Sequence, residues 1–493
     1  MTLKNVTAHP VKPYCTVLLF VNVFGTAIGS PNKTIDSINM IPPVTNIASL
    51  NVALLKRIII PALILFFSAS AFCQQTWNLT RCIDYAENNN IDLTISRNSV
   101  KTQQINLQQS KASLFPDLEA GSQVNVNFGR NIDPNTNDVT FNRTMQNYYW
   151  VNSSVNIFQG LVKANTIRFN NYLLAADKQE ALFKKNQLVF KILTAYYTVV
   201  YSSGLVEVAK NQVALSEKQI ERTKIFVKVG RESTLTVQEL QSQHAGDMLS
   251  LTRAQNLYNK TLLELKQLLR LGASTPFNVD TAITFQISLQ PIPDVDSLFT
   301  KSINAMPQIR QQEMLYRASK KELAIAKGYI SPRIYISGGY STNFFDGAEM
   351  TFTKQLENNQ NQWVNMGVSI PLFNNALTHS KIKRKQIALN NQKLLLEKER
   401  ETLYTEIWKA VDDLRSAKSE YLSAEALNRF SRLSLKNITA KMEKGLAGTT
   451  DYDVAKQRYI SSQATLLKAK LIYIMRMQML EFYRKGNWEH LYR

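Results

Sequence analysis

Two carboxylates in the last tenth of the chain, Asp451 and Asp453, are the side chains with the clearest potential for chemistry. A ring of carboxylates that several chains contribute can narrow a passage and favour cations. The ordinary alternative is that an acid at this place stabilises the N-terminus of a helix. Both interpretations depend on where these residues lie in the fold, so the elements that position them have to be identified first.

The rest of the sequence offers no catalytic constellation. The histidines are scattered, at His9, His244, His379 and His490. They show no metal-ligand spacing and no nucleophile partner, and the chain contains no phosphate-binding glycine loop or dinucleotide fingerprint. We therefore predict that the protein is not an enzyme and that it binds no metal or cofactor.

Three local patterns recur about 215 residues apart and in the same order. Pro116 recurs as Pro332, Trp150-Val151-Asn152 recurs as Trp363-Val364-Asn365, and Gly230 recurs as Gly445. Such self-similarity indicates a duplicated supersecondary unit. We predict three segments: a leader with a signal peptide over 1–73, a first repeat over 74–290 and a second over 291–493.

Each repeat is predicted to form a helix, two strands and then two very long helices. Glycine and proline are scarce, at 17 and 14 of 493 residues, which favours a few long elements. The first helices are expected over 79–114 and 297–330, because Pro116 and Pro332 disfavour helix at the residues before them. Beyond the N-terminal region, no stretch of the sequence has the roughly 20 uninterrupted apolar residues of a membrane-spanning helix.

The long helices are expected from residue 160 to about 227 and from 374 to 443. Each ends at a glycine, Gly230 or Gly445, which suits the left-handed position after a helix. Helices over 236–271 and 450–483 then return antiparallel, the first beginning at a capping box from Thr236 to Glu239 and the second at a looser version from Thr450 to Asp453. Leucine-rich stripes indicate coiled-coil-like seams in these hairpins: Leu249, Leu257, Leu265 and Leu268, and Leu466, Leu467, Leu471 and Met475.

The strands alternate between apolar and polar residues. From Leu118 to Phe128 the even positions are apolar apart from Ser122, and the second strand sets Tyr149, Val151, Val155 and Ile157 against Asn152, Ser154 and Asn156. This pattern is typical either of a sheet half-buried on a soluble core or of a transmembrane barrel. The expected length of about 10 residues and the aromatic residues near the strand ends fit a bilayer. Four strands are too few to close a barrel and open edges cannot lie in lipid, so several chains would have to share one barrel.

The N-terminal region carries an export signal. Lys56-Arg57 precedes an apolar run over 58–67, small residues follow, and cleavage after Cys73 is plausible. Cys73 raises the question of a lipid anchor, against which the bulky Phe72 argues. The formal net charge is +20. Because the basic residues alternate with acids along helical faces and the chain is exported, we expect no nucleic-acid partner. The basic run from Lys381 to Lys385 can be a solvated helix face or can touch lipid headgroups.

The ordered, duplicated pattern resembles the TolC-like outer-membrane efflux channel family. The resemblance covers roughly residues 76–485. Its marks are the segments 88–93 and 306–309, the Phe115-Pro116 and Ser331-Pro332 entries to the strands, the exits at 155–160 and 368–374, and Asp451-Tyr452 six residues after Gly445. In the first repeat Thr236 stands where the family often has Asp.

The resemblance implies a homotrimer whose strands, four per chain, form one twelve-stranded barrel in outer-membrane lipid above a periplasmic α-helical tunnel. Such a channel passively conducts substrates in a tripartite efflux or type I secretion system, together with a periplasmic adaptor (membrane fusion) protein and an inner-membrane transporter. The resemblance assigns Asp451 and Asp453 to a pore constriction. It assigns adaptor docking to the hairpin tips: Val229, Gly230, Ser233, Thr234, Gly445, Leu446, Ala447 and Thr449.

Two other classes of protein remain open at this point. A periplasmic coiled-coil adaptor or scaffold without a pore would also have long helical hairpins, although adaptors usually carry one hairpin beside glycine-rich β domains. An exported helical enzyme would need a catalytic constellation, which the sequence lacks. The transported substrate, the partner pump and the resting state of the pore are not indicated by the sequence.

Overall fold

The computed structural model describes residues 76–132, 137–140, 143–272, 274–281, 291–346 and 350–491. The chain divides into two units, Met1–Phe72 and Cys73–Arg493, and every described residue belongs to the second. The predicted signal peptide and Cys73 lie outside the described residues.

The order of the main elements in the first half is repeated in the second. The first half contains α2 (Leu79–Asn89), α3 (Ile91–Ala112), β1 (Asp117–Asn127), β4 (Thr144–Gln159), α4 (Val162–Lys228) and α5 (Thr234–Leu268). The second half contains α6 (Val295–Ser302), α7 (Pro307–Gly328), β5 (Arg333–Phe345), β6 (Asn361–Ser369), α9 (Leu377–Glu443) and α10 (Thr449–Lys485). Short additions are β2 (Asn131–Ile132), β3 (Val139–Thr140), α8 (Phe352–Asn358) and a 3-10 turn, Glu489–Leu491. This order agrees with the predicted duplication.

The first helix of each half is broken, although the sequence predicted one continuous helix. Asn90 begins a new helix, because its side-chain oxygen accepts a hydrogen bond from the Leu93 backbone at 3.1 Å and caps α3. In the second half Pro307 occupies the first position of α7, where its missing N–H costs nothing. The predicted capping box at Thr236 is also wrong, since α5 begins at Thr234 and Ser233 caps it.

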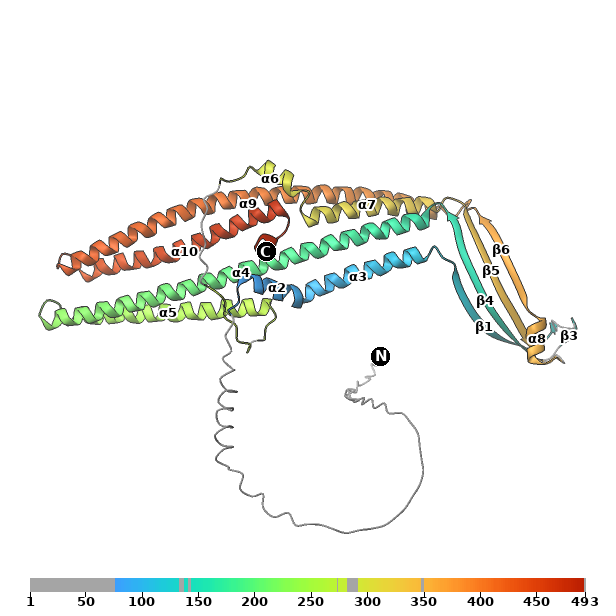
Figure 1. Ribbon diagram of the computed structural model, residues 1–493, viewed down its shortest axis with the longest axis horizontal. Helices are drawn as coiled ribbons and strands as arrows, with labels where there is room; N and C mark the ends of the chain where they lie inside the picture. Colours follow the sequence, from blue (N-terminus) through green and yellow to red (C-terminus); the bar gives the residue numbers. More distant parts are fainter. Residues whose placement is uncertain are drawn as a thin grey trace, which may run out of the picture. The chain divides into compact units, whose positions relative to one another are not determined.

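The four long strands form one antiparallel sheet in the order β1-β4-β5-β6, which lies at one end of the helices (Figure 1). The register places the predicted apolar residues on one face, where Val151 lies opposite Ala120 and Tyr340. A bulge between Asn156 and Phe158 shifts the register there, so that Phe158 rather than Ile157 lies opposite Ile334. β4 has 16 residues, more than expected, and Tyr148, Tyr149 and Trp150 therefore lie within the strand rather than near its end.

The apolar face of the sheet is open to solvent in the single chain. Leu118 is 76% exposed, Val364 is 85% exposed and Met366 is 66% exposed. Among the described residues only the short helix α8 packs extensively on the sheet, at the free end of β5. The described part of the chain therefore provides no soluble core for these strands, which argues against the first of the two interpretations of their alternation.

The opposite face of the sheet combines polar side chains with aromatic rings that lie over glycines. A Cβ atom added to Gly121 would lie 2.3 Å from the Trp150 ring, and one added to Gly367 would lie 2.4 Å from the Tyr335 ring. The glycines thus make room for rings from the neighbouring strands.

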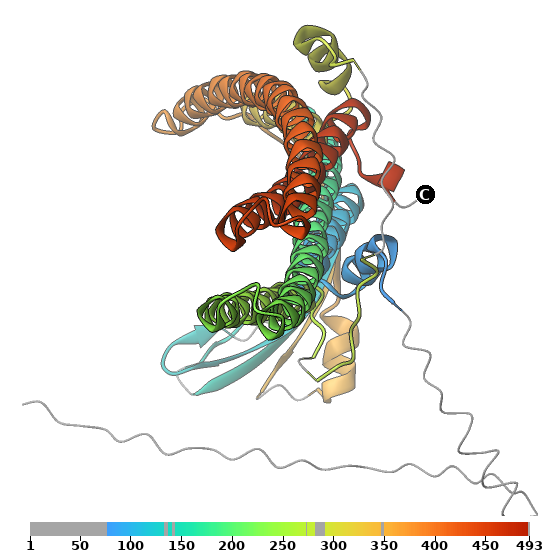
Figure 2. The ribbon, with the colours of Figure 1, turned by 90° about the vertical axis from the view of Figure 1, so that its left-hand side faces the viewer.

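The helices pack side by side in a single curved row (Figure 2). Near the sheet the order of packing neighbours is α3-α4-α7-α9, and toward the hairpin tips it is α5-α4-α10-α9. The short helices α2 and α6 lie on the convex side of this row (Figure 2). Both the row of helices and the sheet therefore have two edges, one formed by α3, α5 and β1 and the other by α9 and β6.

The core lies where the short helices cover the long ones. α4 is apolar and long enough to pass as a membrane span, but part of that stretch packs against α2, α5 and α10, with Val189, Ile192 and Leu193 fully buried. The predicted seam residues Leu265 and Leu471 are buried in this core. By contrast Leu249 is 50% exposed and Leu257 is 39% exposed, so these two do not close a seam within the chain.

Candidate functional site

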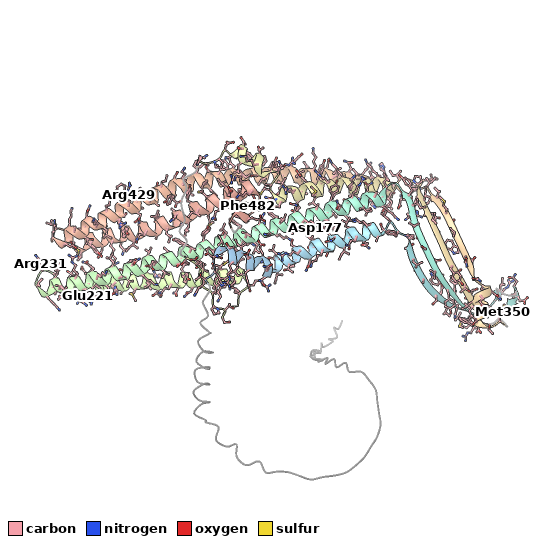
Figure 3. The ribbon with its side chains drawn as sticks, in the orientation of Figure 1. Asp177, Glu221, Arg231, Met350, Arg429 and Phe482 are labelled. Atoms are coloured by element: carbon pink, nitrogen blue, oxygen red, sulfur yellow. The ribbon has the colours of Figure 1, made fainter. Side chains whose placement is uncertain are left out.

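The two hairpin tips, at the end of the helices remote from the sheet, have the same backbone geometry. Gly230 and Gly445 have φ angles of +71° and +72°. In the first tip the Arg231 N–H donates to the Phe226 carbonyl at 2.9 Å, and the second tip repeats this bond from Leu446 to Lys441 at 2.9 Å. Both turns are Schellman motifs, which require a left-handed residue after the helix. Figure 3 shows Arg231 at the first tip and Met350 beyond the strands at the opposite end.

The tips present exposed side chains around these glycines. Val229 is 62% exposed and Leu446 is 73% exposed. A Cβ atom at either glycine would meet no atom within 4 Å, so the left-handed backbone and not crowding requires glycine there. Ser233 caps α5 by accepting from the Leu235 N–H at 3.1 Å. The other predicted docking residues, Thr234, Ala447 and Thr449, belong to the same two turns or the first residues after them.

The two predicted constriction residues differ in their surroundings. Asp451 is exposed, and its Oδ2 accepts from the Gly448 N–H at 3.3 Å, so it stabilises the start of α10. Asp453 is half-buried, and burial is the main cause that raises the pKa of its carboxyl, with Asp247 and Glu239 nearby and Lys456 acting in the opposite direction. Between them Tyr452 is buried, which raises the pKa of its hydroxyl to about 12. Whether these carboxylates form a ring stays a prediction.

A buried ion pair that the sequence did not predict joins the two hairpins. Lys456 Nζ of α10 lies 2.7 Å from Asp247 Oδ2 of α5, and each side chain is 1% exposed. The other carboxylate oxygen accepts from Gln212 of α4 at 2.6 Å and from Gln243 at 3.3 Å. One sequence signal existed: Asp247 lies seven residues after buried Leu240, on the apolar side of α5.

A second, weaker group of contacts joins the hairpins nearer the tips. Arg222 of α4 pairs with Glu443 of α9 at 3.2 Å, and both side chains are partly exposed. Gln219 donates to the sulfur of Met442 at 3.5 Å. Exposed pairs contribute little to stability, so the buried pair of Asp247 and Lys456 is the stronger of these two connections; farther from the tips Tyr197 of α4 also exchanges hydrogen bonds with Gln478 of α10.

Nothing in this region is arranged for covalent chemistry. Within the described residues no group of three His, Cys, Asp or Glu side chains could hold a metal ion. The Ser216 hydroxyl and His244 Nδ1 form a hydrogen bond of 3.0 Å on a packed helix face, and no third group orients the imidazole. The site is therefore a pair of turns with exposed apolar and acidic side chains, and the helices behind them are joined by a buried ion pair.

No protein-family model matches the chain, and a search of curated proteins found no relative. Several solved structures are similar. The outer-membrane protein VceC of Vibrio cholerae has a TM-score of 0.69 at 15% identity, over 83% of this chain and 96% of that one. The outer-membrane channel CmeC of Campylobacter jejuni has a TM-score of 0.71 at 13% identity, over 83% and 86%. The open state of the outer-membrane channel MtrE of Neisseria gonorrhoeae has a TM-score of 0.68 at 14% identity, over 83% and 89%.

These similarities confirm the mainly helical fold of an outer-membrane channel for the single chain. The chain has the fold of TolC-like outer-membrane channels, and the match spans nearly the whole length of each of these proteins. Identities of 13–15% show the fold alone.

Proposed function

We propose that this protein is the outer-membrane channel component of a tripartite efflux or type I secretion system. It is a homotrimer in the outer membrane with a helical periplasmic extension, and it passively conducts substrates delivered by an inner-membrane transporter and a periplasmic adaptor protein. The single observation that carries the proposal is that the described part of one chain leaves both edges of its fold and one face of its sheet uncovered.

The edges of the sheet require strands from other chains. β1 and β6 each pair with only one strand among the described residues. Unpaired backbone groups cannot lie in lipid, and the apolar face has the exposure expected of a surface that contacts lipid. Pairing β1 of one copy with β6 of the next satisfies both conditions, because it closes the sheet and leaves the apolar face outside.

The edges of the helical row also carry unpartnered apolar stripes. On α5 the stripe recurs every 14 residues, at Leu235, Leu249 and Leu263, which are 44–60% exposed. On α9 it comprises Ile387, Leu394, Trp408 and Leu422, which are 41–61% exposed at multiples of seven residues. Heptad spacing is that of helices which pack against other helices. The α5 edge of one copy therefore suits the α9 edge of the next, and a scaffold that functions as a monomer would leave both stripes in water.

The tips then form the periplasmic end of the passage. In a trimer, threefold symmetry would place three copies of Asp451 in a ring. That ring would narrow the opening and attract cations. The exposed residues of the two turns, Val229 and Leu446 among them, are suited to contact an adaptor, because the Schellman turns fix their position.

Single-channel recording in planar bilayers tests this role. We expect Asp451→Ala to raise the conductance and to reduce cation selectivity. Asp451→Asn is the matched variant, because its side-chain oxygen can still accept from Gly448 while the charge is absent. If the charge acts in the pore, both variants differ from the wild type. Conductance and selectivity unchanged in both variants would exclude a constriction role for Asp451.

A further inference from the structure

We propose that the junction between the helices and the sheet contains a binding groove for an anionic phospholipid, with Lys163 as the ligand of the headgroup phosphate. The inference rests on the proposed function, since it places this junction at a membrane surface.

The groove has a volume of about 310 Å³ and lies where β4 passes into α4. Its apolar walls include side chains from the end of α3, from β4 and from the turn into α4: Leu114, Val155, Ile157, Phe158 and Leu161. The register sets Val155 opposite Ile336, and Phe158 opposite Ile334, on the open apolar face of the sheet. The groove is thus continuous with the surface that would contact hydrocarbon, and its dimensions and walls suit part of an acyl chain.

Lys163 lies at the same groove and provides its only charged side chain. No ion-pair partner for Lys163 occurs within the described ranges. The charge of Lys163 acts on the Asp117 carboxylate without a direct ion pair, and Asp117 Oδ1 accepts from the Ser154 N–H at 2.7 Å and from the Ser154 hydroxyl at 2.8 Å. An ammonium group at the rim of an apolar groove is the arrangement that holds a phosphodiester while the acyl chain is buried.

The backbone beside the groove is strained in a way that favours this use. Leu161 has a φ angle of +59°, a left-handed conformation that is unfavourable for a non-glycine residue, yet its side chain is 65% exposed and fills no core. The turn is fixed, because Gly160 and Gly328 are in contact: a Cβ atom on Gly160 would lie 2.3 Å from the Gly328 carbonyl oxygen. The fold therefore holds an apolar side chain outward at a left-handed position; Ala376, with a φ angle of +58° before α9, is the equivalent residue in the second repeat.

The other three junctions repeat the pairing of a lysine with an exposed apolar residue about one turn away. Lys111 precedes Phe115, which is 74% exposed, and Lys327 precedes Ile330, which is 57% exposed. At the fourth junction Lys381 follows Leu377, and its Nζ lies 4.7 Å from the centre of the Tyr329 ring, so it joins two junctions. These lysines form a basic level next to the sheet. The proposal therefore includes headgroup contact for Lys381, whereas Lys385 of the same run pairs with Glu322.

Native mass spectrometry of the full-length protein, extracted from outer membranes in detergent, tests the site. Dioleoyl phosphatidylglycerol and dioleoyl phosphatidylcholine are compared at equal concentration, because they differ in charge but not in acyl chains. We expect preferential retention of phosphatidylglycerol, and a loss of that preference of about fivefold per chain in Lys163→Gln, the factor that corresponds to about 1 kcal/mol per lysine near an anionic surface. Lys224→Gln, on the same helix but far from the sheet, is the matched control and should retain the wild-type preference.

Leu161→Gly tests the apolar wall of the groove separately from the headgroup ligand Lys163. It should weaken retention of both lipids without changing their ratio. Equal retention of the two lipids by the wild type, or an unchanged preference in Lys163→Gln, would overturn the proposal. Complete competition by glycerol 3-phosphate, which lacks acyl chains, would show a phosphate site without a lipid groove and would also overturn it. A trimer that does not discriminate between lipids contradicts this inference alone, whereas a soluble monomer contradicts the proposed function.

Discussion

The buried ion pair between the hairpins provides the sharpest test of the energetics of the tips. Removing one partner of a buried pair leaves a desolvated charge and costs about 3–5 kcal/mol. The two partners are not equivalent here. In Lys456→Met, Asp247 keeps the hydrogen bond from Gln212 at 2.6 Å, so we expect a cost near the lower limit. In Asp247→Asn the Lys456 ammonium loses its carboxylate 2.7 Å away, so we expect a cost near the upper limit.

Hydrogen exchange measured by mass spectrometry gives the corresponding assay. At 1.4 kcal/mol per factor of ten, the expected loss speeds the exchange of amides in α10 around Lys456 by about 100- to 4,000-fold, provided that opening is fast relative to exchange. The double variant Asp247→Asn/Lys456→Met contains no buried charge, so it should exchange more slowly than either single variant. Arg222→Met, which breaks the exposed pair with Glu443, is the control and should change exchange by less than about fivefold.

The result that would refute this reasoning is additivity. If the double variant loses as much protection as the sum of the two single variants, the charges of Asp247 and Lys456 do not interact across the hairpins. Single variants that exchange like the Arg222→Met control would equally show that the pair is solvated.

Three further predictions follow from single residues. Gly328→Ala should destabilise the protein by about 1–3 kcal/mol in thermal or urea unfolding, because the new Cβ would lie 2.6 Å from the Gly160 carbonyl oxygen. The control Gly246→Ala, whose new Cβ would meet no atom within 4 Å, should stabilise the protein by up to about 1 kcal/mol. Equal effects of the two substitutions would contradict the close approach of Gly328 and Gly160. Asp453→Asn should raise the melting temperature at pH 7, because burial raises the pKa of Asp453 in the folded state and so disfavours its charged form. The gain in melting temperature should vanish as the pH falls below the ordinary aspartate pKa. A gain that is independent of pH would contradict this cause. The thiol of Cys82 is fully buried and its pKa is raised to about 12, so iodoacetamide at pH 8 should alkylate it only after denaturation; alkylation of the native protein would contradict the burial.

Local rules were sufficient to predict the features that depend on one stretch of backbone. The recurrence of Gly230 as Gly445 predicted two equivalent tips, and the structure has a Schellman turn at both. Strict alternation predicted which residues share a face of the sheet, because the side-chain period of a strand is two. The bulge at Ile157 is the exception. The apolar pattern continues through it, but the single extra residue shifts the pairing with β5.

Features that depend on contacts between distant residues could not be predicted in this way. The ion pair of Asp247 and Lys456 joins positions 209 residues apart, and neither residue lies in a local motif. The break at Asn90 was missed because the apolar pattern continues across it, whereas the structure shows an extended backbone at Asn90 and a capping bond with Leu93. α8 was missed for a related reason: Gln355, which is fully buried, bonds both the N–H and the carbonyl of Phe345 and so takes the place of a strand that β6 does not reach.

The shared barrel is the central claim, and the native mass of the protein tests it most directly. The protein would be extracted in detergent from the outer-membrane fraction and its mass measured by native mass spectrometry or by light scattering. The account predicts a stable complex of three chains, because no described segment of the chain covers the edges of its sheet or the stripes on α5 and α9, and other copies can. A soluble monomer would contradict it, since β1 and β6 would then have unpaired edges in water and the chain would be a periplasmic scaffold.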